Sequence, residues 1–168
     1  MRDDAITIRS AVPDDVETIV DFNLRLARET EDLALDRATL TRGVGALLDD
    51  PSKGTYFLAT VDGDVVGQLM ITHEWSDWRD GDLWWVQSVY VKQSHRSRGA
   101  FRALFNHVRE AARASGAAGV RLYVDKDNAA AERIYRHLGM TMTGYLVMEQ
   151  TFQPAATPAR EVANRETT

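Results

Sequence analysis

Three arginines cluster around a single glycine in the stretch from Val89 to Arg102. Arg96, Arg98 and Arg102 flank Gly99, where an apolar strand-like run gives way to a helical pattern. The first backbone N–H groups of a helix lack internal partners, and the helix dipole favours negative charge there. Glycine also lets the backbone approach a ligand closely. This pattern predicts a binding site for an anion such as a pyrophosphate, although a solvated basic helix start would give the same pattern.

Two other phosphate-binding motifs are absent around Gly99. A nucleotide-hydrolysing P-loop needs G-K-[ST] to place a lysine and a magnesium-binding hydroxyl, and a dinucleotide-binding fold needs G-x-G-x-x-G. The sequence contains neither pattern here. The sequence therefore does not indicate either of these two nucleotide-binding classes at Gly99.

A second block runs from Asn128 to Met140 and reads N-A-A-A-E-R-I-Y-R-H-L-G-M. It is similar to N-x-x-A-x-x-[LIV]-Y-x-x-L-G-[FM], and Arg96–Ala100 matches the start of [RQ]-x-x-G-x-[GA]. In this order and spacing the two blocks resemble the GNAT superfamily of N-acetyltransferases. Phe101 departs from the pattern, because a glycine or alanine is usual there. A phenyl ring cannot lie against a tightly held phosphate, so we expect it to turn inward and begin the apolar stripe of the helix.

The resemblance covers roughly Ile6 to Glu149 and implies that acetyl-CoA is the co-substrate. It assigns the phosphates to the basic loop, and the pantetheine arm and an oxyanion donor to the backbone of the central strand. The residues that it places at the cofactor are Val89, Tyr90, Val91, Arg96, Ser97, Arg98, Gly99, Ala100, Phe101, Arg102, Asn128 and Tyr135. Asn128 is expected to act as a helix N-cap, as a cofactor contact, or as both.

Acetyl transfer to an amine needs a neutral amine, a donor for the oxyanion and a proton for the departing thiolate. The resemblance gives the last role to Tyr135, because a phenol with a pKa of about 10 stays protonated and can donate. Amphipathic packing on a short helix is the alternative for this residue.

The general base is less clearly indicated. Many family members have a carboxylate near the positions of Gln87 and Ser88, and neither residue can act as a base. We predict Glu74, expecting the neighbouring Trp75 and Trp78 to exclude water and raise its pKa. A surface position is the alternative, and Glu29, Glu31 or a water chain is held in reserve.

The acceptor site is expected beside Glu29, Glu31, Trp75 and Trp78. Carboxylates and aromatic rings together suit an amine cation, through Coulomb attraction and cation–π contact. The tryptophans could equally form a hydrophobic lid or a dimer contact. A homodimer is therefore compatible with the sequence.

Hydrophobic periodicity predicts the elements that hold these residues. Helices are expected from Pro13 to the stripe ending at Leu24, from Leu40 to Leu48, from Phe101 towards Gly116, and over Ala129–Leu138. The predicted strands are Ala5–Arg9, Tyr56–Val61, Val65–Thr72, Leu83–Val91, Val120–Val124 and Tyr145–Met148. His73–Asp82 is read as a polar connection.

The predicted fold class is mixed α/β, with a central, mostly antiparallel sheet of six to seven strands flanked by helices, as in GNAT-like acyltransferases. Residues 1–152 are expected to form one domain, and residues 153–168 a polar, disordered tail. At 168 residues the chain can bury a full core without cross-links.

Composition excludes several classes of function. The chain has no cysteine, which rules out disulfides and thiolate chemistry and suits the cytoplasm. Its net charge of −5 argues against a nucleic-acid partner. No signal peptide or membrane-spanning run is evident, and the four histidines lack metal-ligand spacing. An acetyltransferase is the favoured function, and an acyl-CoA-binding module without turnover is the alternative.

Overall fold

Five strands form the central sheet in the order β1-β3-β4-β5-β6. The structure is a computed structural model and describes residues 5–152 and 156–158. The strands are β1 (Thr7–Ser10), β3 (Thr55–Val61), β4 (Asp64–Ser76), β5 (Gly81–Val91) and β6 (Gly119–Leu122). Neighbouring strands are antiparallel except β5 and β6, which are parallel. A separate two-stranded sheet pairs β2 (Leu33–Leu35) with β7 (Ala156–Pro158).

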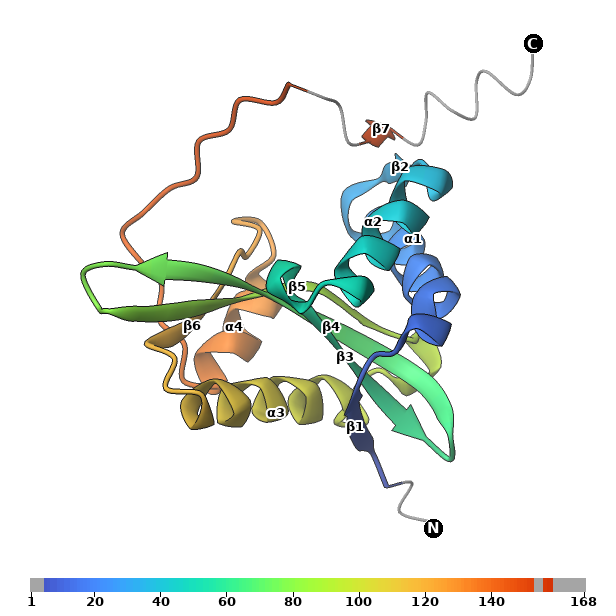
Figure 1. Cartoon of the computed structure of the whole chain (residues 1–168), viewed down its shortest axis with the longest axis horizontal. Helices are drawn as coiled ribbons and strands as arrows, with labels where there is room; N and C mark the ends of the chain where they lie inside the picture. Colours follow the sequence, from blue (N-terminus) through green and yellow to red (C-terminus); the bar gives the residue numbers. More distant parts are fainter. Residues whose placement is uncertain (1–4, 153–155, 159–168) are drawn as a thin grey trace.

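Four α-helices cover the central sheet (Figure 1). Helices α1 (Val16–Glu31) and α2 (Arg37–Asp49) lie over one face, and α3 (Ala100–Ala114) lies over the other with α4 (Ala129–His137) beside β6. Three short 3-10 helices lie over Pro13–Asp15, Pro51–Lys53 and Gln93–His95. The predicted placement of helices on both faces is confirmed.

Each face of the sheet has its own hydrophobic core. Ile19 and Val20 of α1 and Val44 of α2 pack on Leu58. On the opposite face, Leu104, Phe105 and Val108 of α3 pack against other strand residues. The predicted 3.6-residue spacing is what gathers these side chains on one side of each helix. The sheet is thereby fixed between two apolar layers.

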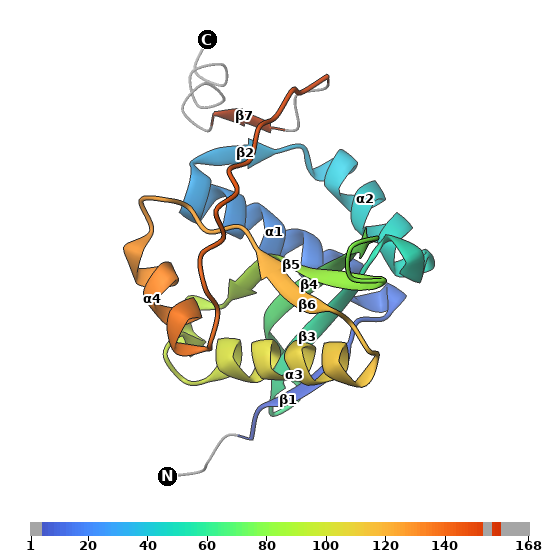
Figure 2. The same ribbon diagram turned by 90° about the vertical axis from the view of Figure 1, so that its left-hand side faces the viewer.

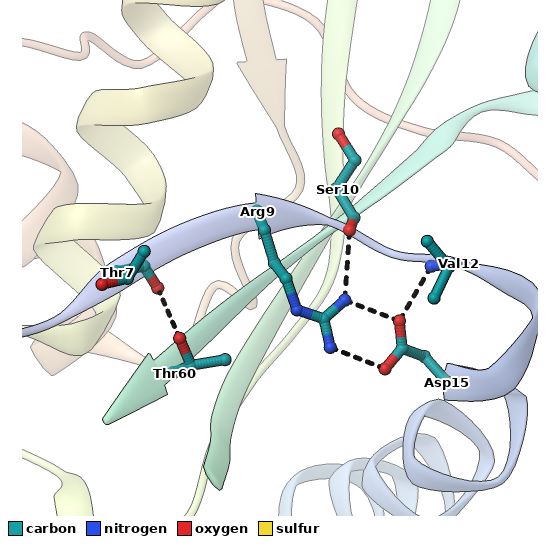
Figure 3. A network of polar contacts seen from close by, with 6 residues as sticks. All are labelled: Thr7, Arg9, Ser10, Val12, Asp15 and Thr60. Atoms are coloured by element: carbon teal, nitrogen blue, oxygen red, sulfur yellow. Dashed lines mark hydrogen bonds and ion pairs between the residues drawn. The ribbon is translucent and has the colours of Figure 1, made fainter. Parts of the chain in front are cut away.

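An ion pair joins the first strand to the start of the first helix (Figure 3). The Arg9 guanidinium donates to both carboxylate oxygens of Asp15 at 2.7 and 2.8 Å. The Asp15 carboxylate also accepts from the Val12 N–H at 2.8 Å, and the guanidinium reaches the Ser10 carbonyl at 3.2 Å. The Arg9 hydrogen bonds, ahead of other causes, hold the pKa of Asp15 below its usual value. The Arg9 guanidinium and the Asp15 carboxylate thus satisfy each other within the chain.

The parallel strands β5 and β6 pair only at the beginning of β5. Their register ends at Val86 with Leu122, and β5 continues as far as Val91. A bulge between Gln68 and Met70 of β4 lies opposite this part of β5, where Ser88 has a φ of 48°. The last residues of β5 therefore leave one edge without a strand partner among the described residues.

Three expectations about the fold need correction. The central sheet has five strands rather than six to seven, because Tyr145–Met148 is exposed and unpaired instead of forming a last strand. The polar stretch His73–Asp82 is mostly strand: β4 runs to Ser76 and β5 starts at Gly81, so the two form a long hairpin. Charged and aromatic side chains are compatible with a strand whose faces are exposed, so polarity alone was misleading there.

The predicted disordered tail falls almost wholly outside the described residues. Of residues 153–168 the structure describes only 156–158, which form β7 against β2. Within the described ranges, no helix has the length and apolar character needed to cross a membrane.

Candidate active site

The candidate site begins where β5 separates from β6. Val89 and Val91 turn partly buried side chains toward the α3 core, and Tyr90 lies on the opposite side against Phe22 of α1. Side chains in all three positions are thus used for packing, and the backbone is the part left to bind a ligand. A peptide-like arm can pair with such a free strand edge as an added strand does.

The α3 N-terminus follows directly and has no side-chain cap. Gly99 precedes the helix with a φ of 92°, a conformation that favours glycine, and Ser97 has a φ of 62°. The backbone N–H groups of Ala100 and its neighbours in the first turn therefore lack a capping acceptor. Arg98 and Arg102 are exposed, and neither forms an ion pair among the described residues. Orphan donors and unpaired cations together can bind an anion.

Arg96 differs from the other two arginines because it is already engaged. Its guanidinium forms an ion pair with Glu29 at the end of α1, and its Nε donates to the Val91 carbonyl at 3.0 Å. The same guanidinium lies 5.5 Å from the centre of the Tyr90 ring, while the Tyr90 hydroxyl donates to Glu29 at 2.9 Å. The Arg96 hydrogen bond is the main reason why the pKa of Glu29 lies below its usual value.

Glu29 was expected at the acceptor amine, and in the structure it is paired with Arg96 of the basic loop. The helix α1 extends to Glu31, so Glu29 lies on its last turn rather than in a connection. A carboxylate with a lowered pKa is a weaker base. The position therefore suits holding Arg96 better than removing a proton.

Tyr135 lies against the start of α3. Its ring meets Phe101 edge-on at 5.8 Å and lies 6.5 Å from Phe105. Phe101 packs toward the core, as expected from its place in the apolar stripe. Burial raises the pKa of Tyr135, so the hydroxyl stays protonated at neutral pH. No hydrogen-bond partner holds that hydroxyl among the described residues, and it is available as a donor.

Asn128 caps the helix that carries Tyr135. Its Oδ1 accepts from the Ala131 N–H at 3.0 Å. The side-chain oxygen thus fixes the first turn of α4, one of the two roles predicted for it. The amide nitrogen is not used in this bond.

Glu74 is surrounded differently from what the sequence suggested. It lies in β4 opposite Leu83, accepts a hydrogen bond from Trp85 Nε1, and is 3.5 Å from the Arg121 guanidinium. The expected shielding by Trp75 and Trp78 is wrong: their side chains are 63% and 86% exposed. Successive strand residues point to opposite faces, so Trp75 cannot cover its neighbour.

Glu74 and Tyr135 nevertheless line one cavity of about 590 Å³ beside β6. Along β5, Leu83 precedes Ser88 by five residues, roughly 17 Å in an extended strand. Glu74 is therefore far from the bulge and lies near the end of the β5–β6 ladder where Leu83 pairs with Gly119.

A second cavity, of about 380 Å³, lies between the sheet and the two helices α1 and α2. Glu31 and Ser88 both line it, so the structure brings Glu31 to the bulged part of β5. Trp75 and Trp78 line neither this cavity nor the one beside β6. Of the four residues expected at the acceptor, only Glu31 reaches a cavity next to the bulge.

A buried polar chain beneath the smaller cavity was missed from the sequence. Gln68 Nε2 donates to Asn23 Oδ1 at 2.8 Å, and Asn23 Nδ2 donates to the Tyr56 hydroxyl at 2.9 Å. Gln68 Nε2 also reaches the Ser88 carbonyl at 3.2 Å, while Gln68 Oε1 is buried without a partner. The available signal was Asn23, a polar residue on the buried stripe of an otherwise apolar helix face.

Within the described residues, no group of histidine, cysteine, aspartate or glutamate side chains could hold a metal ion.

Comparison with known proteins agrees with this geometry. Residues 18–140 match the Acetyltransferase (GNAT) family. A solved structure of a possible acetyltransferase from Clostridium difficile 630 is 45% identical, with a TM-score of 0.83 over 89% of this chain and 99% of that chain.

Two curated relatives are streptothricin acetyltransferases. The Streptomyces lavendulae protein is 30% identical over 100 residues, which are 60% of this chain and 51% of the relative. The Escherichia coli protein is 26% identical over 146 residues, which are 80% and 81% of the two chains. The chain thus aligns with about half the length of the first relative and four fifths of the second. The family match spans most of the chain and includes both sequence blocks around the split sheet, so this protein belongs to the GNAT family of acetyltransferases.

Proposed function

We propose that the protein transfers the acetyl group of acetyl-CoA to a primary amine of a small molecule or peptide by direct attack on the thioester. The observation that carries this proposal is the uncapped, cationic start of α3, which follows the part of β5 whose outer edge has no strand partner among the described residues. A ligand with phosphates and a peptide-like arm suits both features at once. Acetyl-CoA would supply the thioester carbon that the amine attacks.

Arg98 and Arg102 hold the phosphates together with the first N–H groups of α3. The backbone of residues 88–91 pairs with the pantetheine arm and donates to the carbonyl oxygen as it becomes an oxyanion. The amine nitrogen forms a bond to the carbonyl carbon, and the carbon–sulfur bond breaks. Tyr135 gives its proton to the departing thiolate, and a carboxylate takes the proton that the amine loses.

Two carboxylates are proposed for that last role. Glu74 shares a cavity with Tyr135, although it is held by Trp85 and Arg121. Glu31 lines the cavity next to Ser88 and is set among apolar side chains such as Leu33 and Leu35. The acidic limb of the kcat/KM profile distinguishes the two carboxylates. Glu74→Gln abolishes the limb if Glu74 is the base, and Glu31→Gln abolishes it if Glu31 is the base. The limb persists in both variants if a water chain carries the proton.

The acceptor is proposed to enter the cavity between α1, α2 and the sheet. A cationic amine would be attracted by Glu31 and oriented toward the bulge at Ser88. Streptothricin is a specific acceptor to test, since two curated relatives acetylate it by name.

Free-thiol release is the direct test, and this chain suits it because it has no cysteine of its own. Acetyl-CoA is incubated with a panel of amines that includes streptothricin, an aminoglycoside, free amino acids and a lysine peptide. Amine-dependent thiol release supports the proposal. A thermal shift with acetyl-CoA but no release with any amine would favour a binding module without turnover, and no shift at millimolar acetyl-CoA would contradict the cofactor assignment.

A further inference from the structure

The walls of the cavity proposed for the acceptor are mainly aliphatic. This cavity of about 380 Å³, called the acceptor cavity from here on, is lined by α1, α2 and the short strand β2 that joins them along the chain (Figure 2). The aliphatic side chains of its wall include Leu26, Leu33, Leu35, Leu40, Val44 and Leu47. Leu33 and Leu35 both face it because side chains alternate along a strand. Such a wall favours a hydrocarbon group that leaves water.

Charge is scarce in the acceptor cavity. Glu31 is exposed, and it is the one carboxylate among the described residues that line the cavity. The other polar groups there are neutral: Asn23 donates to the Tyr56 hydroxyl at 2.9 Å, and burial raises the pKa of that hydroxyl. One positive charge on a ligand therefore has a partner at Glu31. A second would face neutral groups or hydrocarbon.

The size of the acceptor cavity limits the part of a ligand that can enter it. A water molecule takes about 30 Å³ in the liquid, so a cavity of about 380 Å³ has room for roughly a dozen groups of that size, such as methylenes. An amine on a short aliphatic or aromatic body fits this space. A polyamine or an aminoglycoside would leave further ammonium groups against the aliphatic wall, where the loss of hydration has no compensating partner.

A glycine on α2 keeps part of this space open. Gly43 lines the acceptor cavity, and its φ is not in the left-handed region. A Cβ atom at this position would have no heavy atom within 4 Å beyond its adjacent residues and the helix backbone. Neither the backbone conformation nor a close approach thus requires glycine here, although glycine weakens a helix interior relative to alanine. Gly43 is therefore a position at which a longer side chain would reduce the cavity.

We propose that the acceptor is an amine with a single positive charge on an apolar body of up to about a dozen non-hydrogen atoms, and that Gly43 keeps the room for that body. The inference rests on the proposed acetyl transfer and names the acceptor class. Glu31 and Ser88 line the same cavity. The amine can therefore lie near the carboxylate that attracts it and near the bulge where transfer is proposed, while the body packs on the aliphatic wall.

A matched pair of amines provides the first test. Hexylamine and 1,5-diaminopentane have the same number of non-hydrogen atoms and differ in one end, a methyl group in the first and an ammonium group in the second. Thiol release from acetyl-CoA is expected to give a kcat/KM at least about 10-fold higher for hexylamine, because the second ammonium has no partner. Phenethylamine should also exceed streptothricin. A preference for the diamine or for streptothricin would overturn this inference and leave acetyl transfer intact.

A binding measurement separates this inference from the proposed function. In the presence of coenzyme A, which has no acetyl group to give, hexylamine should raise the melting temperature more than 1,5-diaminopentane does. Stabilisation by hexylamine without thiol release from acetyl-CoA would refute the transfer and retain the amine site. If hexylamine and phenethylamine give neither stabilisation nor thiol release, the inference is wrong, whether or not another amine reacts.

Gly43→Phe tests the cavity itself. It should raise KM for hexylamine at least about 10-fold and leave Kd for acetyl-CoA unchanged, because the ring occupies space that the body of the amine needs. Gly45→Phe is the matched control: Gly45 lies on the same helix and has the same free space around a Cβ atom, but it does not line the acceptor cavity. The control should change neither value.

Urea denaturation verifies that both phenylalanine variants fold. Gly43→Leu, a better helix former than glycine, repeats the measurement if Gly43→Phe is unstable. An unchanged KM for hexylamine in the folded variant at Gly43, or an equal increase in Gly45→Phe, would show that this wall does not hold the acceptor.

Discussion

Two helix starts in this protein use arginine in opposite ways. At the start of α1, Arg9 is bound on both carboxylate oxygens of Asp15, which also accepts from the Val12 N–H. At the start of α3, Gly99 offers no side-chain cap, and Arg98 and Arg102 have no acidic partner among the described residues. Neither helix has a side-chain cap on its first N–H groups; the difference is that the arginine at the first start has a carboxylate partner and the arginines at the second have none among the described residues.

This difference separates a structural role from a binding role without reference to sequence motifs. Helix N-termini favour negative charge wherever they occur. Where the chain provides a carboxylate, as at Asp15, the benefit is folding stability. Where it provides cations and free N–H groups, as around Gly99, we propose that a ligand supplies the anion. The variants described next test this difference between the two helix starts.

The largest effect is expected from reversing charge at the open helix start. The double variant Arg98→Glu, Arg102→Glu should raise the Kd for acetyl-CoA on the order of 1,000-fold, since each charge-assisted bond contributes about 1.5–3 kcal/mol. Isothermal titration calorimetry measures it. The matched control is Arg42→Glu, Arg113→Glu, which alters net charge equally on exposed helix faces and should leave Kd nearly unchanged. An equal loss in both variants would mean that only overall charge matters.

Removing the Tyr135 hydroxyl, which lies beside the start of α3, tests turnover separately from the binding of acetyl-CoA. Tyr135→Phe keeps the contact with Phe101 and should lower kcat by about 100-fold with little change in Kd for acetyl-CoA. Steady-state kinetics and calorimetry give the two values. An unchanged kcat would indicate that solvent protonates the thiolate and that Tyr135 serves packing alone.

At the closed helix start the expected effect is on stability. Asp15→Asn removes the negative charge and one of the two oxygens that accept from Arg9 and Val12 in partly buried hydrogen bonds, and it should cost about 2 kcal/mol of unfolding free energy, measured by urea denaturation. The pKa of Asp15 is lowered in the folded state, so its contribution is fully present above the unfolded pKa of about 3.9 and is lost as pH falls through the folded pKa. The difference between wild type and variant should therefore be constant from pH 7 to 5 and shrink below about pH 4. Acetyl-CoA affinity should not change, and a parallel loss of affinity would contradict the separation of the two starts.

The smallest effect is expected at Arg96, which has a carboxylate partner as Arg9 does but lies in the same loop as Arg98. Glu29→Gln removes its ion pair and should raise KM for acetyl-CoA by about 5-fold at most, because exposed pairs contribute up to about 1 kcal/mol. The control is Glu31→Gln on the same helix end, which should leave KM for acetyl-CoA unaltered. A large fall in kcat with Glu29→Gln and no change in KM would instead assign Glu29 to the acceptor chemistry.

Much of the fold was predictable because local patterns carry it. The apolar stripes of α1, α2 and α3 follow helical spacing, and the spacing selects part of their buried residues, such as Ile19, Val44 and Leu104. In α1 the residues Phe22, Asn23 and Ala27 are buried as well. Asp62 and Gly63 form a typical hairpin turn sequence between the two predicted strands, and β3 and β4 pair antiparallel on either side of it. The stretch Tyr145–Met148 read as a strand but has no partner among the described strands, since pairing depends on an edge that no local pattern specifies.

The sequence by itself determined the order of elements, the basic loop around Gly99 and the block that carries Tyr135. Those features arise from residue types at short spacings, where backbone geometry leaves few alternatives. Only the tertiary structure decided which charged side chains have a partner of opposite charge and which do not. Glu29 and Arg96 lie 67 positions apart and meet across α1 and β5, Glu74 is held by Trp85 and Arg121 from other strands, and Arg98 and Arg102 meet no acidic partner among the residues that the structure describes. Whether a side chain is satisfied depends on what long-range packing places within a few ångströms of it, and that information is not contained in any local stretch of the chain.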